Sequence, residues 1–123
     1  MPQEAALHRI ALVLSAVLAV VIAVLTLTPG DGVPGPSGMD KVYHFTAFAA
    51  LVWPVTASRP RTALWAVPAA IAFGIAIEII QPHVGRHREL GDVVANSLGA
   101  LAGAGLGWVA HTLALRHFGG GRG

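Results

Sequence analysis

Hydrophobic residues along this chain fall into four stretches that short polar segments separate. The stretches are Ile10–Leu27, Val42–Ala57, Thr62–Ile80 and Val93–Leu115. A hydrocarbon core of about 30 Å needs roughly 20 helical residues, a length that the first, third and fourth stretches approach or exceed. The second is shorter and crosses only if Asp40 and Lys41 lie at the headgroup level. The pattern predicts an all-α polytopic membrane protein: one domain over 1–123, a four-transmembrane-helix bundle with helices over about 10–27, 42–57, 62–81 and 92–115, and a flexible tail over 116–123.

Composition supports the membrane interpretation. Hydrophobic residues make up 54% of the chain and charged residues 11%, too few charges to cover the surface of a soluble fold. Cysteine is absent, which excludes disulfides and thiolate metal sites. The basic residues are scattered among the links, so we expect no nucleic-acid partner. No cofactor motif occurs, and no cofactor is predicted.

Charge also predicts the orientation. With four crossings, one side of the membrane carries five Lys or Arg residues and the other three, which favours cytoplasmic termini in a bacterial inner membrane. The first apolar stretch is longer than the core of a signal peptide and lacks a small-x-small cleavage site before Pro29, so we expect an uncleaved helix. The proline- and glycine-rich link over 28–39 and the polar link over 82–91 then face outward.

This topology brings distant polar residues to one membrane surface. The second helix begins there at Asp40, the third ends there at Gln81, and the fourth begins there near Asp92. Asp40 and His44 are four residues apart and share a helix face, as do Glu78 and Gln81 with Gly74. A carboxylate inside an apolar segment costs roughly 2–3 kcal/mol on insertion scales, so Glu78 is expected to face protein, water or a ligand.

The fourth helix carries a stripe of polar and small residues at intervals of three or four. Its members are Glu89, Asp92, Asn96, Gly99, Gly103 and Gly107. Glycines at this spacing let another helix approach closely. The partner helix can belong to the same chain or to a second copy, so a homo-oligomer through Gly99, Gly103 and Gly107 is one expectation.

Three blocks of the sequence together resemble the VanZ-like membrane proteins. The blocks are DKVYHF at Asp40–Phe45, EIIQ at Glu78–Gln81, and RHRELGDVVANSLGALAG at Arg86–Gly103. The resemblance covers about 40–107 and implies a bacterial multi-pass membrane protein with an extracytoplasmic polar cluster. The namesake of the family is associated with resistance to the glycopeptide antibiotic teicoplanin. Resistance is not carried over to this chain.

Three functions fit these residues. The favoured one is recognition of an anionic or sugar-bearing headgroup, on a membrane lipid or a lipid-linked cell-envelope intermediate. Its predicted ligand-binding residues are Asp40, Lys41, His44, Glu78, Gln81, Arg86, Glu89, Asp92 and Asn96, with Arg86 and Lys41 on the anion. The second is a membrane-embedded hydrolase or transferase, with Glu78 or Asp92 as general base and His44 as acid.

The third function is structural. Glu78 then pairs with Arg86, Lys41 or His44 to tie helices together, and Asp40 and Asp92 cap helix starts. A zinc site through His83 and His87, four residues apart, can also be drawn. Pro82 and Gly85 argue against a regular helix there, so no metal site is predicted.

Overall fold

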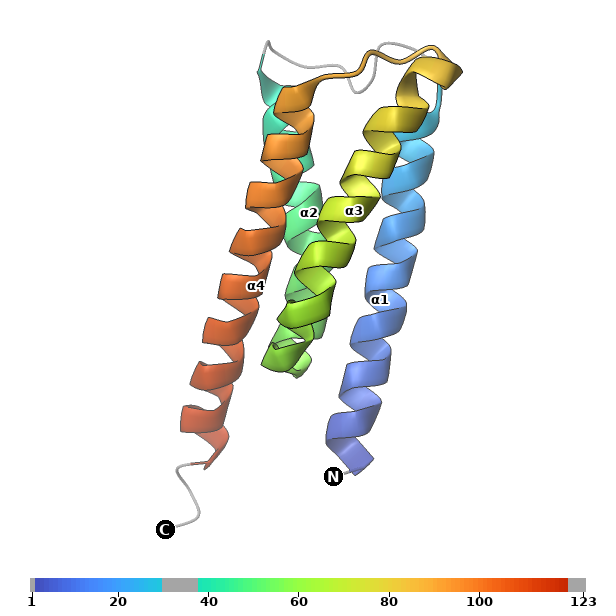
Figure 1. The fold of residues 1–123 in the computed structure, drawn as a ribbon. Coiled ribbons are helices and arrows are strands. Elements are labelled where there is room, and N and C mark those ends of the chain that lie inside the picture. The colour runs from blue at the N-terminus through green and yellow to red at the C-terminus, as the bar shows by residue number, and fades with distance from the viewer. Residues whose placement is uncertain (1, 30–37, 120–123) are drawn as a thin grey trace.

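The structure is a bundle of four long helices. This computed structural model describes residues 2–29 and 38–119, and Figure 1 shows the helices side by side, alternating in direction. The elements are α1 (Pro2–Leu27), α2 (Met39–Ser58), the short 3-10 helix η1 (Pro60–Thr62), α3 (Ala63–Ile80), the short 3-10 helix η2 (Gln81–Val84) and α4 (Leu90–Gly119). The described residues contain no strand. The all-α fold is therefore confirmed.

The alternation gives the bundle two distinct ends. At the upper end in Figure 1, α1 ends at Leu27, α2 begins at Met39, and the segment 81–89 joins α3 to α4. At the lower end lie the start of α1, the turn over 58–62 and the last turns of α4.

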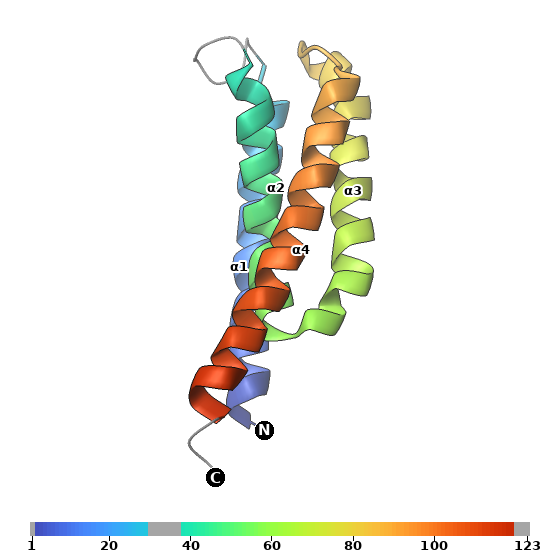
Figure 2. The same cartoon turned by 90° about the vertical axis from the view of Figure 1, so that its left-hand side faces the viewer.

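Three of the four helices are long and apolar enough to cross a membrane. The corresponding segments are Pro2–Leu27, Pro60–Val84 and Leu90–His117. Large apolar side chains cover their outer surfaces, among them Val13, Leu64 and Leu101, each more than half exposed. Such surfaces are typical of lipid-facing helices. The second helix is not among these three, but it lies beside them in both views (Figures 1 and 2).

The helix bounds differ from the predicted ones where polar residues continue a helix. The first helix begins at Pro2 instead of residue 10, because proline is tolerated in a first turn and good helix formers follow it. The tail predicted as flexible from residue 116 is helical to Gly119. Residues 120–123, and 30–37 of the first link, lie outside the described residues.

Glycines set the close packing of α4 against α2. A Cβ atom added at Gly99 would overlap the carbonyl oxygen of Phe45, and one at Gly103 would overlap that of Ala49. At Gly107 an added Cβ would lie 2.7 Å from the Cβ of Thr56. The glycine face is thus occupied by α2 of the same chain, and a second copy could reach it only by displacing α2.

Two other glycines shape the packing of the third helix and the turn that follows it. Gly74 faces the Phe48 ring, since a Cβ there would lie 3.3 Å from two of the ring atoms. Gly85, in the left-handed region at φ 79°, ends η2 and lets the chain turn toward α4.

Candidate functional site

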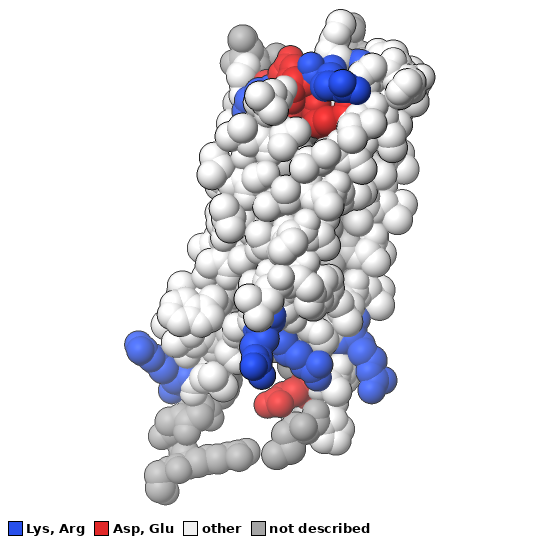
Figure 3. Space-filling model, viewed as in Figure 1, with Lys and Arg blue, Asp and Glu red and all other residues white. Residues whose placement is uncertain are grey.

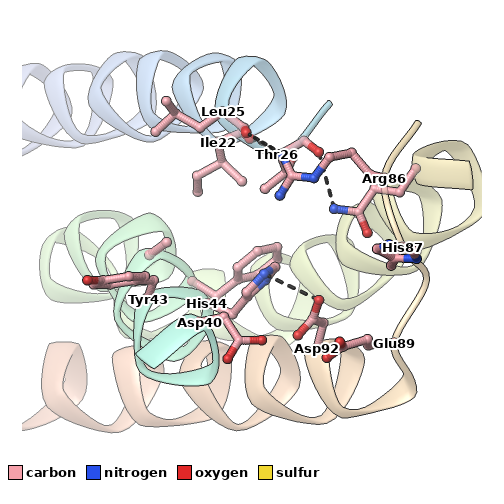
Figure 4. A pocket seen from close by; sticks show the side chains of 13 residues that line it. Ile22, Leu25, Thr26, Asp40, Tyr43, His44, Arg86, His87, Glu89 and Asp92 are labelled. Atoms are coloured by element: carbon pink, nitrogen blue, oxygen red, sulfur yellow. Dashed lines mark hydrogen bonds and ion pairs between the residues drawn. The ribbon is translucent and has the colours of Figure 1, made fainter. Parts of the chain in front are cut away.

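A pocket of about 250 Å³ opens at the upper end of the bundle. Its apolar wall comes from α1 and α2, with Ile22, Leu25, Ala47 and Phe48. Its polar lining comes from α1, α2, η2, the link that follows η2, and α4. These residues are Thr26, Asp40, Tyr43, His44, Gln81, Arg86, His87, Glu89 and Asp92 (Figure 4). Since Phe48 lies eight residues into α2 after Asp40, roughly 12 Å along its axis, the pocket becomes more apolar with depth.

Lys41 lies at the centre of a cluster of carboxylates beside this pocket. Its Nζ lies 2.8 Å from Asp40 Oδ2 and 2.6 Å from Asp92 Oδ1, and it also pairs with Glu89. Figure 3 shows acidic side chains gathered at the upper end, with basic ones beside them. Burial acts to lower the pKa of Lys41, but its hydrogen bonds to Asp40, Asp92 and Glu89 raise that pKa overall. The hydrogen bond that Lys41 donates to Asp40 also lowers the pKa of Asp40. The lysine is therefore fully engaged within the protein.

His44 is held between two residues of α4. Its Nδ1 lies 2.8 Å from Asn96 Oδ1, and its Nε2 lies 3.4 Å from Asp92 Oδ2 (Figure 4 marks the second contact). Asn96 is 1% exposed, and its Nδ2 has no hydrogen-bond partner among the described residues. Two polar side chains of α4 thus fix one imidazole at the pocket wall.

Glu78 lies behind the pocket, 3% exposed. Its Oε2 accepts a hydrogen bond from the backbone N–H of Glu89 at 3.0 Å, and its Oε1 has no partner in the described chain. The predicted pairing with Arg86, Lys41 or His44 does not form among the described residues. This structural interpretation of Glu78 was wrong about the partner: the carboxylate instead holds the start of α4 through a backbone amide.

Two side chains connect the link between α3 and α4 to the end of α1. Gln81 Nε2 donates to the carbonyl oxygen of Thr26 at 3.2 Å. Arg86 Nη1 donates to the carbonyl oxygens of Leu25 at 3.3 Å and Thr28 at 3.1 Å. The last carbonyls of a helix have no partner within it and carry partial negative charge, so a cation stabilises them. Arg86 therefore closes the pocket on the α1 side.

The structure brings all nine predicted site residues to this one end. Six line the pocket: Asp40, His44, Gln81, Arg86, Glu89 and Asp92. The other three, Lys41, Glu78 and Asn96, lie behind and bond to the lining residues or to their backbone.

Two predicted roles need correction. Asp40 does not cap its helix, because Gly38 occupies the cap position and the Asp40 side chain bonds to Lys41 instead. Asp92 likewise lies inside the first turn of α4, where its side chain bonds to Lys41 and His44.

Sequence reasoning missed the contribution of α1. Ile22, Leu25 and Thr26 line the pocket, as do Tyr43 and His87. The predicted topology already ended the first helix at the same membrane surface, a signal that could have identified these α1 residues. Tyr43 lies inside the DKVYHF block, and the sequence pattern indicates His87 only as a candidate metal ligand.

The carboxylates also have a spacing that suits a cation. Single oxygens of Asp40, Glu89 and Asp92 lie within 4.8 Å of one another. The Lys41 ammonium bonds to all three residues and supplies the positive charge there. His83 and His87 are not part of this group.

Comparison with known proteins identifies one relationship. The family model described as VanZ/LLP1 matches residues 5–111 of the chain. No curated protein and no solved structure matches at a significant level.

Proposed function

The chain belongs to the VanZ/LLP1 family of membrane proteins, and from this premise we propose that its upper-end pocket recognises an anionic or sugar-bearing lipid headgroup. The observation that carries the proposal is the composition of the pocket. Carboxylates, imidazoles and a guanidinium surround its polar part, and Ile22, Leu25, Ala47 and Phe48 form its apolar wall. A lipid has the same two parts, because its polar headgroup is joined to hydrocarbon chains. Cell-envelope lipids and lipid-linked precursors are the proposed ligands.

The proposal includes a topology. The second helix is taken as a fourth span over 42–57, since it is 20 residues long and lies among three candidate spans. Both termini are then on the cytoplasmic side of a bacterial inner membrane, in keeping with the excess of Lys and Arg at the lower end. The pocket opens to the extracytoplasmic face.

The contacts of the two cations refine the predicted roles. Lys41 is engaged with three carboxylates and does not line the pocket, so it is not assigned to an anion. Arg86 uses only Nη1 for its two carbonyl contacts, which leaves Nε and Nη2 as donors for a phosphate or carboxylate. Asp40, Glu89 and Asp92 can accept hydrogen bonds from sugar hydroxyls.

Native mass spectrometry of the protein extracted with its lipids tests this function. Ala47 lines the pocket and Ala50 on the same helix is exposed outside it, so the two positions form a matched pair. Ala47→Met is expected to remove the bound lipid by filling the pocket, and Ala50→Met to retain it. Arg86→Gln and Glu78→Gln should each reduce the bound lipid. Lipid that stays bound in Ala47→Met, Arg86→Gln and Glu78→Gln alike would contradict the proposal.

Catalysis is the second candidate, favoured by the facing pair of His44 and Asp92 at 3.4 Å on the pocket wall. A histidine beside a carboxylate can move a proton to or from a water or hydroxyl group. Conversion of the co-purified lipid during incubation, lost in His44→Gln, would support a hydrolase or transferase. Stable binding without conversion would leave recognition as the function.

Unchanged lipid with lowered thermal stability in Glu78→Gln and Asp92→Asn would support a purely structural role.

A further inference from the structure

A second, larger groove lies at the opposite end of the bundle. It has a volume of about 700 Å³ and lies between the start of α1, the turn after α2 and the last turns of α4. Its apolar lining is Leu7, Ala57, Pro60, Ala114 and Leu115. Volumes of this size suit a small organic ligand. None of the predicted site residues takes part in it.

The charged lining of this groove is mostly basic. Arg59 and Arg61 line it from the turn, and Glu4 is the single carboxylate in the lining. Among the described residues, neither arginine pairs with a carboxylate. Figure 3 shows basic side chains around the lower end, with acidic colouring confined to a small area among them. The groove therefore offers two unpaired guanidinium groups to an anion.

Hydrogen bonds hold the backbone of the turn and the His111 side chain beside the groove in place. The N–H of Arg59 donates to the carbonyl oxygen of Val55 at 3.0 Å, and the carbonyl oxygen of Arg59 accepts from Thr62 N–H at 2.9 Å. Because a carbonyl oxygen only accepts, the 2.8 Å contact between His111 Nδ1 and Ala57 O places the proton on Nδ1. A preformed site of this kind binds without ordering a loop.

A second side-chain bond holds the α1 wall. His8, 9% exposed, contacts Ser58 Oγ through Nδ1 at 2.7 Å. This bond joins α1 to the end of α2 beside the groove, so α1, α2 and α4 are all connected at this end.

We infer that this groove binds an anionic phospholipid, with the phosphate on Arg59 and Arg61 and the first acyl carbons against Leu7, Ala114 and Leu115. Inorganic phosphate could use the arginines but would leave the apolar walls uncovered. A neutral detergent could use the walls but not the arginines. The two arginines and the apolar walls lie together at the end of membrane-length helices, where lipid headgroups are the abundant anions. The inference is independent of the function proposed for the upper pocket.

The test uses the full chain carrying Ala47→Met, so that the upper pocket does not contribute, titrated with phosphatidylglycerol and counted by native mass spectrometry. Arg59→Gln with Arg61→Gln should weaken binding roughly thirtyfold, since each charge-assisted contact to the phosphate contributes about fivefold. Arg9→Gln with Arg116→Gln removes the same charge outside the groove and should change binding less than about twofold, because solvent and salt screen charges that do not contact the phosphate. Glu4→Gln should strengthen binding, a gain that damage to the fold would not produce.

Other outcomes would overturn the inference. An equal loss in the two double variants would mean diffuse attraction to the basic end. Equal binding of phosphatidylcholine would mean that the arginines do not select an anion. Displacement of the lipid by millimolar inorganic phosphate would mean that the groove takes free phosphate.

Discussion

Lys41 and Asp92 lie 51 positions apart in the sequence, yet Lys41 Nζ is 2.6 Å from Asp92 Oδ1. The pair joins the first turn of α2 to the first turn of α4, above the face where the glycines of α4 contact α2. Asp92 also contacts His44, so the ion pair and the pocket wall share one carboxylate. Packing between the two helices and the shape of the pocket are consequently coupled.

Lys41→Met is expected to destabilise the protein. The Asp92 side chain is 8% exposed and would lose its cation. Removing one partner of a buried pair costs 3–5 kcal/mol, and because the Lys41 side chain is 36% exposed we expect about 2 kcal/mol here. Thermal unfolding in detergent measures this loss. Adding Asp92→Asn should recover part of the loss, and strictly additive losses would show that the two residues do not interact.

Stability should also fall in acid through Asp40. Its pKa in the folded protein lies below the ordinary value of 3.8 because Lys41 donates a hydrogen bond to the carboxylate. A lowered pKa adds stability at pH above about 3.8, and this contribution is lost as the pH falls through the folded pKa. The unfolding midpoint measured against pH should therefore drop less steeply in acid for Asp40→Asn. A parallel drop in variant and parent would assign the acid sensitivity to other groups.

Two glycines of α4 provide a matched test of the close packing. Gly103→Ala would force a methyl group against the carbonyl oxygen of Ala49, whereas a Cβ at Gly105 meets nothing within 4 Å. We expect Gly103→Ala to cost about 1–3 kcal/mol through overpacking. Gly105→Ala should be neutral or stabilise by up to about 1 kcal/mol, because alanine has the higher helix propensity. Similar midpoints for the two variants would mean that α2 and α4 separate easily.

Hydropathy predicted the four helices but not where they begin and end. An apolar stretch reports the part of a helix that suits lipid, and a helix can continue into polar residues on either side. This is why α1 begins at Pro2 and α4 continues to Gly119. The cap expected at Asp40 failed for the same reason, since the helix already begins at Met39 after Gly38.

The site was predictable as far as it depends on side-chain spacing and topology. Helical spacing grouped Asp40 with His44, and the alternation of helices brought both to the start of α4. The contribution of α1 was indicated only by the predicted end of the first helix at this surface, because the polar groups that this helix end offers to Arg86 and Gln81 are backbone carbonyls. The spacing of side chains along the sequence also does not determine which charged residues pair in space. It therefore could not predict that Lys41 bonds to three carboxylates.

Arg86 and Arg88 should support different helix ends. Arg86 donates to the carbonyl oxygens of Leu25 in α1 and of Thr28 directly after it, whereas Arg88 donates to those of Glu78 and Ile79 in α3. Removing a hydrogen bond to a cation at an exposed helix end costs about 1 kcal/mol, or roughly fivefold in local opening. Hydrogen exchange should therefore accelerate in the last turn of α1 for Arg86→Gln.

The matching change, Arg88→Gln, should accelerate exchange near 78–84 and leave α1 unchanged. Each arginine serves as the control for the other, since the two variants lose the same charge within three residues of sequence. Faster exchange at both helix ends in both variants would mean that the link between α3 and α4 opens as one unit. In that case the lipid loss expected for Arg86→Gln would report the opening of this link instead of a lost contact with the headgroup.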